Sequence, residues 1–223
     1  TGKGNELSLA VRSKCKFMGN KGNIYVVGDK PSDEVISNVI WLEANDIYVH
    51  CKDANIIHKC LVAALYPDIT EEFLIWSDDQ VAMKKFDSNI LNENLLLAEY
   101  TIDTAKEFVF AAATSTWWSR CLLTLQRYGY GAKLPEPHIP VKVNRDKFIE
   151  VMLNSGYSTR TDCTIYPLYF NAVDVNYKEN DGYYYHSRNG EWNKNITPTI
   201  VGYNNGSYSL ISKSLVILLT HYD

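Results

Sequence analysis

Along residues 5–79, segments with apolar residues at helical spacing alternate with short continuous apolar runs that are typical of strands. This alternation constrains the fold more than any other feature of the sequence. Residues 5–18 carry apolar side chains at helical spacing after the glycine-containing turn "TGKGN". The runs "NIYVVGDKP", "NVIWLEA" and "EEFLIWSDD" indicate three short strands, and "DANIIHKCLVAALYP" indicates a helix that Asp53 caps and Pro67 ends. This order, with short connections, predicts an α/β fold with a mostly parallel central sheet flanked by helices.

The second half of the chain has a less regular pattern. Residues 145–156 predict a helix that ends at Gly156. The segment "TWWSRCLLTLQRYG" favours a helix, and "NENLLLAEYTIDTAKEF" is helical or mixed. Residues 174–223 alternate Tyr, Asn, Gly and β-branched residues, which is typical of short strands and loops. With no internal repeat and no linker, we expect a single domain over residues 1–223.

The bulk composition narrows the class of protein. The 223 residues are 46% hydrophobic and carry a net charge of −4, which argues against a disordered chain and against nucleic acid as the main partner. No apolar run reaches the roughly 18 residues of a membrane-spanning helix, and "TGKGNELSLA" lacks the pattern of a signal peptide. The five cysteines are dispersed without a CxxC spacing, which predicts reduced thiols and a cytoplasmic location.

Two adjacent carboxylates, Asp78 and Asp79, directly follow the apolar run "FLIWS". In open α/β sheets, ligands gather at the carboxyl ends of the strands. Side chains alternate along a strand, so two neighbours face one ligand only where the chain turns. We expect Asp79 to contact Mn²⁺ or Mg²⁺ directly and Asp78 to act through water or a ligand hydroxyl. The alternative is a turn whose carboxylates lie in water.

The segments "NELSLAVRS", "NIYVVGDKP", "NIIHKCLVAAL" and "EEFLIWSDDQ" resemble, in order and spacing, the nucleotide-binding half of glycosyltransferases with the A-type (GT-A) fold. Within that family the chain is most similar to viral enzymes that act on a capsid-protein glycan. The resemblance implies a nucleotide-binding half in residues 1–100 and an acceptor-side half in residues 101–223. It also implies a metal-binding Asp-x-Asp-like motif, which here is Ser77-Asp78-Asp79, with serine in the first acidic position.

The turn Gly2-Lys3-Gly4 opens the first predicted helix. Its main-chain N–H groups and lysine are therefore candidates for contact with a pyrophosphate or a base. A plain N-terminal turn is the alternative. The resemblance places Arg12 near the nucleotide, and a solvated helix arginine is the alternative there.

Asp53, Asn55 and Lys59 lie on or near the first turns of the second predicted helix, and Asn55 and Lys59 share a face. In similar enzymes this helix contacts the ribose and the donor sugar. The resemblance therefore implies that these residues, with Ser77 and Asp78, bind the nucleotide sugar. Helix capping and surface charge are the alternative.

Three further polar elements are candidates for catalysis or metal binding. His138 lies between prolines in "EPHIP", which suits hydrogen bonding to a phosphate or proton transfer. Arg160 and Asp162, in the loop "GYSTRTDC", are candidates for orienting the acceptor. His221 follows the apolar run "SLVILLT", and the resemblance implies that it completes the metal shell. The alternatives are a buried structural histidine, an ordinary ion pair and a frayed chain end, respectively.

These features predict a metal-dependent, retaining hexosyltransferase that takes a glucose- or rhamnose-type sugar from a UDP-sugar donor. The expected acceptor is a hydroxyl group of a glycan or glycoprotein, in viral capsid-protein or surface-glycan synthesis, and the domain is expected to belong to a longer multidomain chain. Three alternatives stay open: a sugar-1-phosphate phosphotransferase, a non-enzymatic glycan-binding module that uses the Tyr-rich residues 157–222, and a Mg²⁺-dependent phosphohydrolase.

Overall fold

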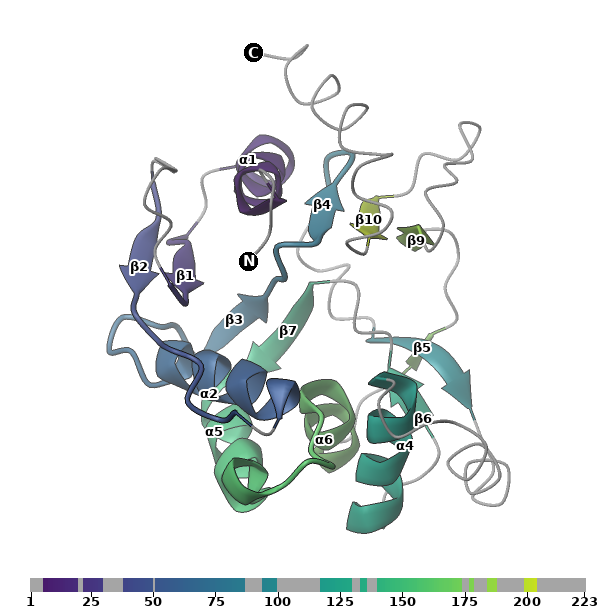
Figure 1. Cartoon of the computed structure of the whole chain (residues 1–223). Helices are drawn as coiled ribbons and strands as arrows, with labels where there is room; N and C mark the ends of the chain where they lie inside the picture. The colour runs from purple at the N-terminus through teal and green to yellow at the C-terminus, as the bar shows by residue number, and fades with distance from the viewer. Residues whose placement is uncertain are drawn as a thin grey trace.

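The computed structural model describes residues 6–19, 22–29, 38–49, 51–86, 94–99, 117–129, 133–135, 140–173, 177–178, 184–187 and 199–203. These residues form a mixed α/β structure of helices and small sheets (Figure 1). The helices are α1 (Glu6–Met18), α2 (Lys52–Ala64), α4 (Trp117–Tyr128), α5 (Arg145–Asn154) and α6 (Ile165–Ala172), with a short 3₁₀ helix η2 (Tyr157–Thr159). The strands are β1 (Tyr25–Val27), β2 (Ile40–Leu42), β3 (Glu72–Ile75), β4 (Gln80–Ala82), β5 (Asn94–Glu99), β6 (Lys133–Pro135), β7 (Val141–Asn144), β8 (Tyr177–Lys178), β9 (Tyr184–Ser187) and β10 (Ile200–Tyr203).

The described strands do not form the single, mostly parallel central sheet that the sequence predicts. They form two- and three-stranded sheets in the orders β1-β2, β3-β7, β4-β10-β9 and β6-β5-β8. The pairs β1-β2, β9-β10 and β5-β8 are parallel, whereas β3-β7, β4-β10 and β5-β6 are antiparallel. The local hydrophobic pattern does not show which distant strands pair with each other, as β3 does with β7.

The start of α2 corrects one prediction. Asp53 does not cap this helix; Cys51 occupies the N-cap position and makes no side-chain hydrogen bond to the helix. Asp53 lies inside the first turn, where it forms an ion pair with Arg120 of α4. In α5, by contrast, the Asn144 side chain accepts a hydrogen bond from the main-chain N–H of Lys147, as an N-cap does.

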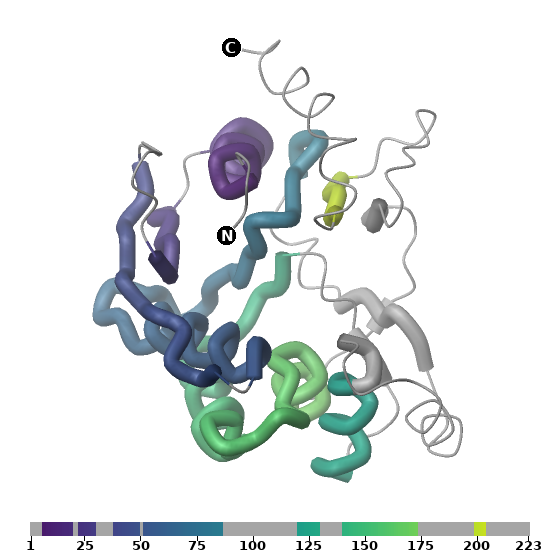
Figure 2. Tube along the Cα trace, viewed as in Figure 1, coloured from purple at the N-terminus to yellow at the C-terminus, as the bar shows by residue number. Residues whose placement is uncertain are grey.

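Three hydrophobic clusters lie in the described part of the chain, the smallest of them formed by Ala82, Phe86 and Ile200. The largest lies where α2, β7, α5 and α6 meet, and it includes the fully buried Ile57, Phe148 and Leu168. The second joins α1, β4 and β10 through residues such as Leu9 and Val81. In Figure 2, β10 lies beside β4, as their antiparallel pairing requires.

Helix α1 is fixed to β4 by a buried polar contact as well as by packing. The Ser13 hydroxyl donates to the main-chain oxygen of Ala10 at 2.8 Å and accepts from the main-chain N–H of Ala82 at 3.1 Å. Because both hydrogen bonds are buried, they fix the position of α1 along β4. Among the helices of the described segments, none is both long enough and apolar enough to cross a membrane.

Candidate functional site

The predicted acidic motif forms a tight turn between β3 and β4, residues 77–80, called the acidic turn below. The main-chain N–H of Gln80 donates to the oxygen of Ser77 at 3.2 Å, and the Gln80 side chain accepts from the N–H of Ser77 at 3.2 Å. The indole of Trp76 donates to the main-chain oxygen of Gln80 at 2.9 Å. The chain therefore turns at the point where the sequence offers two adjacent carboxylates.

Tyr203, at the end of β10, holds the acidic turn from the other side. Its main-chain N–H donates to the oxygen of Asp79 at 3.0 Å, and its hydroxyl donates to the oxygen of Asp78 at 3.1 Å. Tyr203 is fully buried. The main chain of both aspartates is thus fixed, which leaves only their side chains to respond to a ligand.

The two carboxylates of the turn have different surroundings. Asp78 is exposed, whereas Asp79 is half-buried and its Oδ1 atom is shielded from solvent with no hydrogen-bond partner among the described residues. Burial is the largest cause that raises the pKa of Asp79 from its ordinary value of 3.8 to about 7, and the negative charge of Asp78 adds to it. A buried carboxylate in this state requires a proton or a cation.

Glu6 and Lys52 extend this site to the starts of α1 and α2. Burial, followed by the charge of Asp78, raises the pKa of Glu6, so Glu6 and the turn form one region of negative potential. The charges of Glu6 and Lys52 act on Asp79 in opposite directions. The acidic turn therefore lies where the N-terminal ends of two helices meet the end of β3.

The acidic turn meets part of the requirement for a divalent cation. Carboxylate oxygens are the ligands that Mg²⁺ and Mn²⁺ prefer, and Mg²⁺ is commonly held by one or two carboxylates with water and substrate phosphates. Asp79 supplies an unpartnered oxygen, and Asp78 supplies an exposed one. Within the described segments, no group of three or more His, Cys, Asp or Glu side chains is arranged to hold a metal. His221, the third predicted ligand, lies outside those segments.

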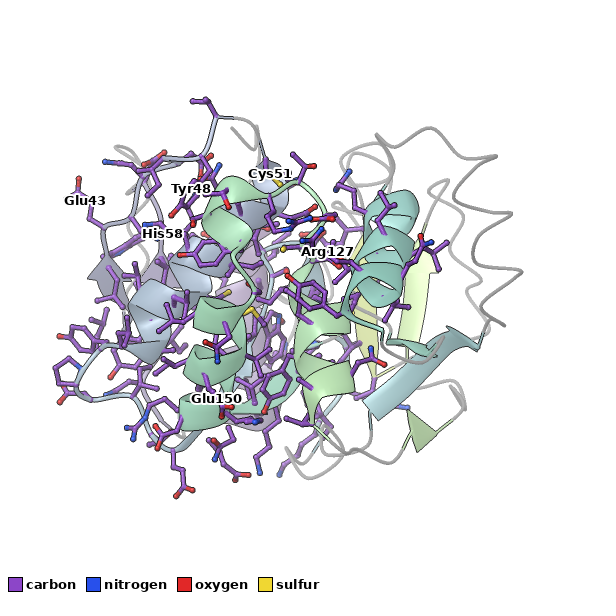
Figure 3. All side chains as sticks on the ribbon, turned by 90° about the horizontal axis from the view of Figure 1, so that it is seen from below. Glu43, Tyr48, Cys51, His58, Arg127 and Glu150 are labelled. Atoms are coloured by element: carbon purple, nitrogen blue, oxygen red, sulfur yellow. The ribbon has the colours of Figure 1, made fainter. Side chains whose placement is uncertain are left out.

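The predicted nucleotide residues of α2 make structural contacts. Asn55 accepts from the N–H of Tyr48 at 2.8 Å and donates to its oxygen at 2.9 Å, which closes the loop before the helix. Tyr48 in turn packs edge-on against His58, with ring centroids 5.9 Å apart (Figure 3). Lys59 pairs with the exposed Asp46 at 2.7 Å. Asn55 is therefore a loop-closing residue in this structure.

The predicted pair Arg160 and Asp162 is present as a bidentate ion pair. Two guanidinium nitrogens of Arg160 each lie 2.7 Å from an oxygen of Asp162. Arg127 of α4 approaches the same carboxylate at 3.2 Å. Two cationic side chains thus share one carboxylate.

Thr124 connects this cluster to α4. Its hydroxyl lies 2.8 Å from the main-chain oxygen of Arg120, 2.7 Å from that of Asp162 and 3.0 Å from the Thr164 hydroxyl. It also accepts from the N–H of Thr164 at 3.1 Å. Because Arg120 pairs with Asp53, a chain of polar contacts runs from the first turn of α2 through α4 to the loop after η2.

A large groove of about 1810 Å³ lies beside the acidic turn. One face of α1, one face of α2 and the strands β1 and β3 line it, and Ser77 and Asp78 lie at its wall. The main aromatic side chains among its lining residues are Phe17, Tyr25, Trp41, Phe73, Trp76, Phe86 and Tyr166. Asp79, Asp53 and Asp162 do not line this groove.

The remaining predicted residues are not brought to the turn. Arg12 is exposed on α1 and does not line the groove. Gly2, Lys3, Gly4 and His138 lie outside the described residues, as His221 does.

Several residues of the site could not be identified from the sequence. Gln80 and Tyr203 hold the acidic turn, and the charges of Glu6 and Lys52 act on Asp79. Arg120 was not a candidate because nothing in the local sequence distinguishes it from a solvated helix arginine. The one available signal was Gln80, a polar residue that directly follows two carboxylates and precedes an apolar run.

The sequence was also compared with known proteins. It matches no known protein family and no curated protein. The chemistry of the acidic turn and of its neighbours therefore carries the functional proposal.

Proposed function

We propose that the chain is a metal-dependent glycosyltransferase that moves a glucose- or rhamnose-type sugar from a UDP-sugar to a hydroxyl group of a glycan or glycoprotein. In this proposal the domain has a GT-A-like arrangement, works in the cytoplasm on a viral capsid or surface glycan, and uses the acidic turn as the site of the donor diphosphate. The observation that carries it is the shielded, unpartnered Oδ1 of Asp79 in a turn whose main chain is fixed.

The charges around the turn suit a diphosphate only if a cation is present. Asp78, Asp79 and Glu6 together would repel a nucleotide. Mn²⁺ or Mg²⁺ held by Asp79 and Asp78 would reverse that potential and stabilise the negative charge of the leaving diphosphate. Lys52, exposed at the first residue of α2, adds a positive charge on the same side.

The reaction requires one bond to form and one to break. The acceptor hydroxyl oxygen bonds to the anomeric carbon, the bond from that carbon to the β-phosphate oxygen breaks, and UDP leaves with the bonding electrons. In the proposal, Asp78 and Asp79 fix the diphosphate end of the donor. The Arg160–Asp162 pair orients the acceptor side, and His138 takes the proton that the acceptor hydroxyl loses.

Calorimetric titration of UDP tests this proposal. We expect binding to the full chain in Mn²⁺, loss of binding in EDTA, and loss in the Asp79→Asn variant. Asp146→Asn is the matched control, because Asp146 is an exposed carboxylate on α5. Binding that survives both EDTA and Asp79→Asn would exclude the metal mechanism. Absence of UDP and GDP binding would favour the glycan-binding alternative.

One observation favours a second function, transfer of sugar-1-phosphate. Within the described part of the chain, Arg127 and Arg160 share the single carboxylate of Asp162, so this cluster carries one positive charge in excess, which suits a phosphate. Product analysis separates the two reactions. Sugar transfer from a UDP-sugar releases UDP, whereas sugar-1-phosphate transfer releases UMP.

A further inference from the structure

The groove between β1 and β3 is bounded in the same way as a central strand of an α/β sheet, with a helix on each face and a strand on each side. Residues Leu7, Ala10, Lys14 and Phe17 of α1 line it at helical spacing, and so do Ile56, Lys59, Cys60 and Ala63 of α2. The strands β1 and β3 form its two sides. In Figure 1, α1 lies above β1 and β3, and α2 lies below them. Two helices and two strand edges therefore enclose the same space.

Each of the two strands has one partner strand among the described residues, β2 for β1 and β7 for β3. The oxygen of Ile24 and the N–H of Gly28 bond to β2. Because main-chain groups alternate along a strand, those of Tyr25 and Val27 point away from β2. The oxygen of Glu71 accepts from Arg145, so by the same alternation the main-chain groups of Leu74 point away from β7.

The apolar side chains of both strands are incompletely covered. Tyr25, Val26 and Val27 of β1 are all only partly buried, and so are Leu74 and Ile75 of β3. Strands with such near-continuous apolar sequences are normally covered on both faces. Ile56 of α2, which lines the groove, is 38% exposed. The groove is thus apolar on its faces and offers main-chain hydrogen bonds at its sides.

The direction of the chain identifies the source of an occupant. Glu6, the first residue of α1, lines the groove together with Asp78, and α1 packs against β4 directly after the acidic turn, so α1 begins near the carboxyl end of β3. α1 then runs back along the groove and leads into β1. A strand that precedes α1 would run parallel to β1, and strand, α1 and β1 would form one βαβ unit.

We propose that the groove receives a β-strand of about five residues, supplied by polypeptide on the N-terminal side of α1. This strand pairs in parallel with β1 and β3 and joins β2, β1, β3 and β7 into one sheet. The inference does not depend on the sugar-transfer proposal, since it rests on the strand edges and on the helix faces that line the groove.

Hydrogen exchange on an extended chain tests the inference. The extension Met-Lys-Val-Ile-Val-Ile-Val is placed directly before Thr1, and the matched control is Met-Lys-Val-Pro-Val-Pro-Val, which removes two donors. We expect exchange at the amides of Tyr25, Val27 and Leu74 to slow by about 100-fold with the first extension only. The amides of Val26 and Phe73, which already bond inside their sheets, are internal controls.

Three results would overturn the proposal. The first is unchanged exchange at Tyr25, Val27 and Leu74 in the strand-extended chain. The second is equal slowing with both extensions, which would indicate non-specific shielding. The third is slow exchange in the unextended chain that deletion of residues 214–223 removes, since the occupant would then be the run "SLVILLT". Should the fused chain fail to fold, the first seven-residue peptide added in trans gives the same readout.

Discussion

Asp53 and Arg120 form an ion pair that joins the first turn of α2 to α4, although the two residues are 67 positions apart in the sequence. The side chain of Asp53 is only 7% exposed and that of Arg120 is 21% exposed. Removing one partner of such a pair leaves the other charge in an environment with little water. The pair therefore makes the mutual position of the two helices sensitive to a single side chain.

Asp53→Ala should destabilise the fold by about 3 kcal/mol, because it removes the buried carboxylate that pairs with the guanidinium of Arg120. Urea denaturation of the wild type and the variant measures this change. Glu150→Ala is the matched control, since it removes an exposed partner of Lys147 and should cost at most about 0.5 kcal/mol. If both substitutions lowered the free energy of unfolding equally, the Asp53–Arg120 pair would not be shielded from water.

Asp79 should make the stability of the metal-free chain fall as the pH rises. Its carboxyl binds a proton more tightly in the folded chain, with a pKa of about 7, than in the unfolded chain, where the ordinary value is 3.8. The contribution is therefore fully present below pH 3.8 and is lost as the pH rises through 7. The loss is on the order of 4 kcal/mol.

Asp79→Asn removes this titration and should raise the melting temperature at pH 8 while leaving it nearly unchanged at pH 4. Thermal unfolding in EDTA over that pH range measures the difference. Asp146→Asn is the control, because Asp146 is an exposed carboxylate on α5 that is not among the charges acting on Asp79. If the Asp79→Asn profile ran parallel to that of the wild type, Asp79 would not be the titrating group.

Thr124→Val should cost about 2 kcal/mol, because the methyl group cannot bond to the oxygen of Asp162 or to the N–H of Thr164. Thr124→Ser keeps the hydroxyl and should cost clearly less. Chemical denaturation of both variants checks the order. A Thr124→Ser variant as unstable as Thr124→Val would assign the role of Thr124 to its methyl group instead.

Tyr203→Phe should weaken Mn²⁺-dependent UDP binding beyond its effect on stability. The substitution removes the donor to the oxygen of Asp78 and should lower the free energy of unfolding by about 1 kcal/mol. Under the proposed function, a looser acidic turn holds the diphosphate less well, which calorimetry measures. Tyr128→Phe is the comparison, since that hydroxyl donates to Ser155 within the larger core. Equal loss of UDP affinity in both variants would contradict a specific role for Tyr203.

Local elements were predictable where the hydrophobic period was long or bounded by a clear turn. α1, α2 and α5 were expected from helical spacing, and Gly156 lies just past α5 with a φ of +67°, a conformation that favours glycine. The segment containing β5 was predicted to be helical or mixed, and its described part, Asn94–Glu99, is a strand. A run of leucines fits either element, and pairing with β6 and β8 decides the outcome.

The contacts of the site depend on distant residues and were less predictable. The position of the two carboxylates at a turn followed from the alternation of side chains. Their different degrees of burial did not, because the surroundings of Asp79 include Tyr203 and Glu6, which are distant in the sequence. Asn55 shows the opposite case, since a residue expected at the donor is engaged by the main chain of Tyr48 seven positions earlier.

The attachment of α1 to β4 through Ser13 has a thermodynamic consequence for the groove. One face of α1 lines the groove, its first residue shares the field of the acidic turn, and its opposite face is fixed. If α1 shifts when the groove is filled, the electrostatic field at Asp78 and Asp79 therefore changes as well. By reciprocity, a strand that tightened cation binding by some factor would itself be bound more tightly by that factor when the cation is present.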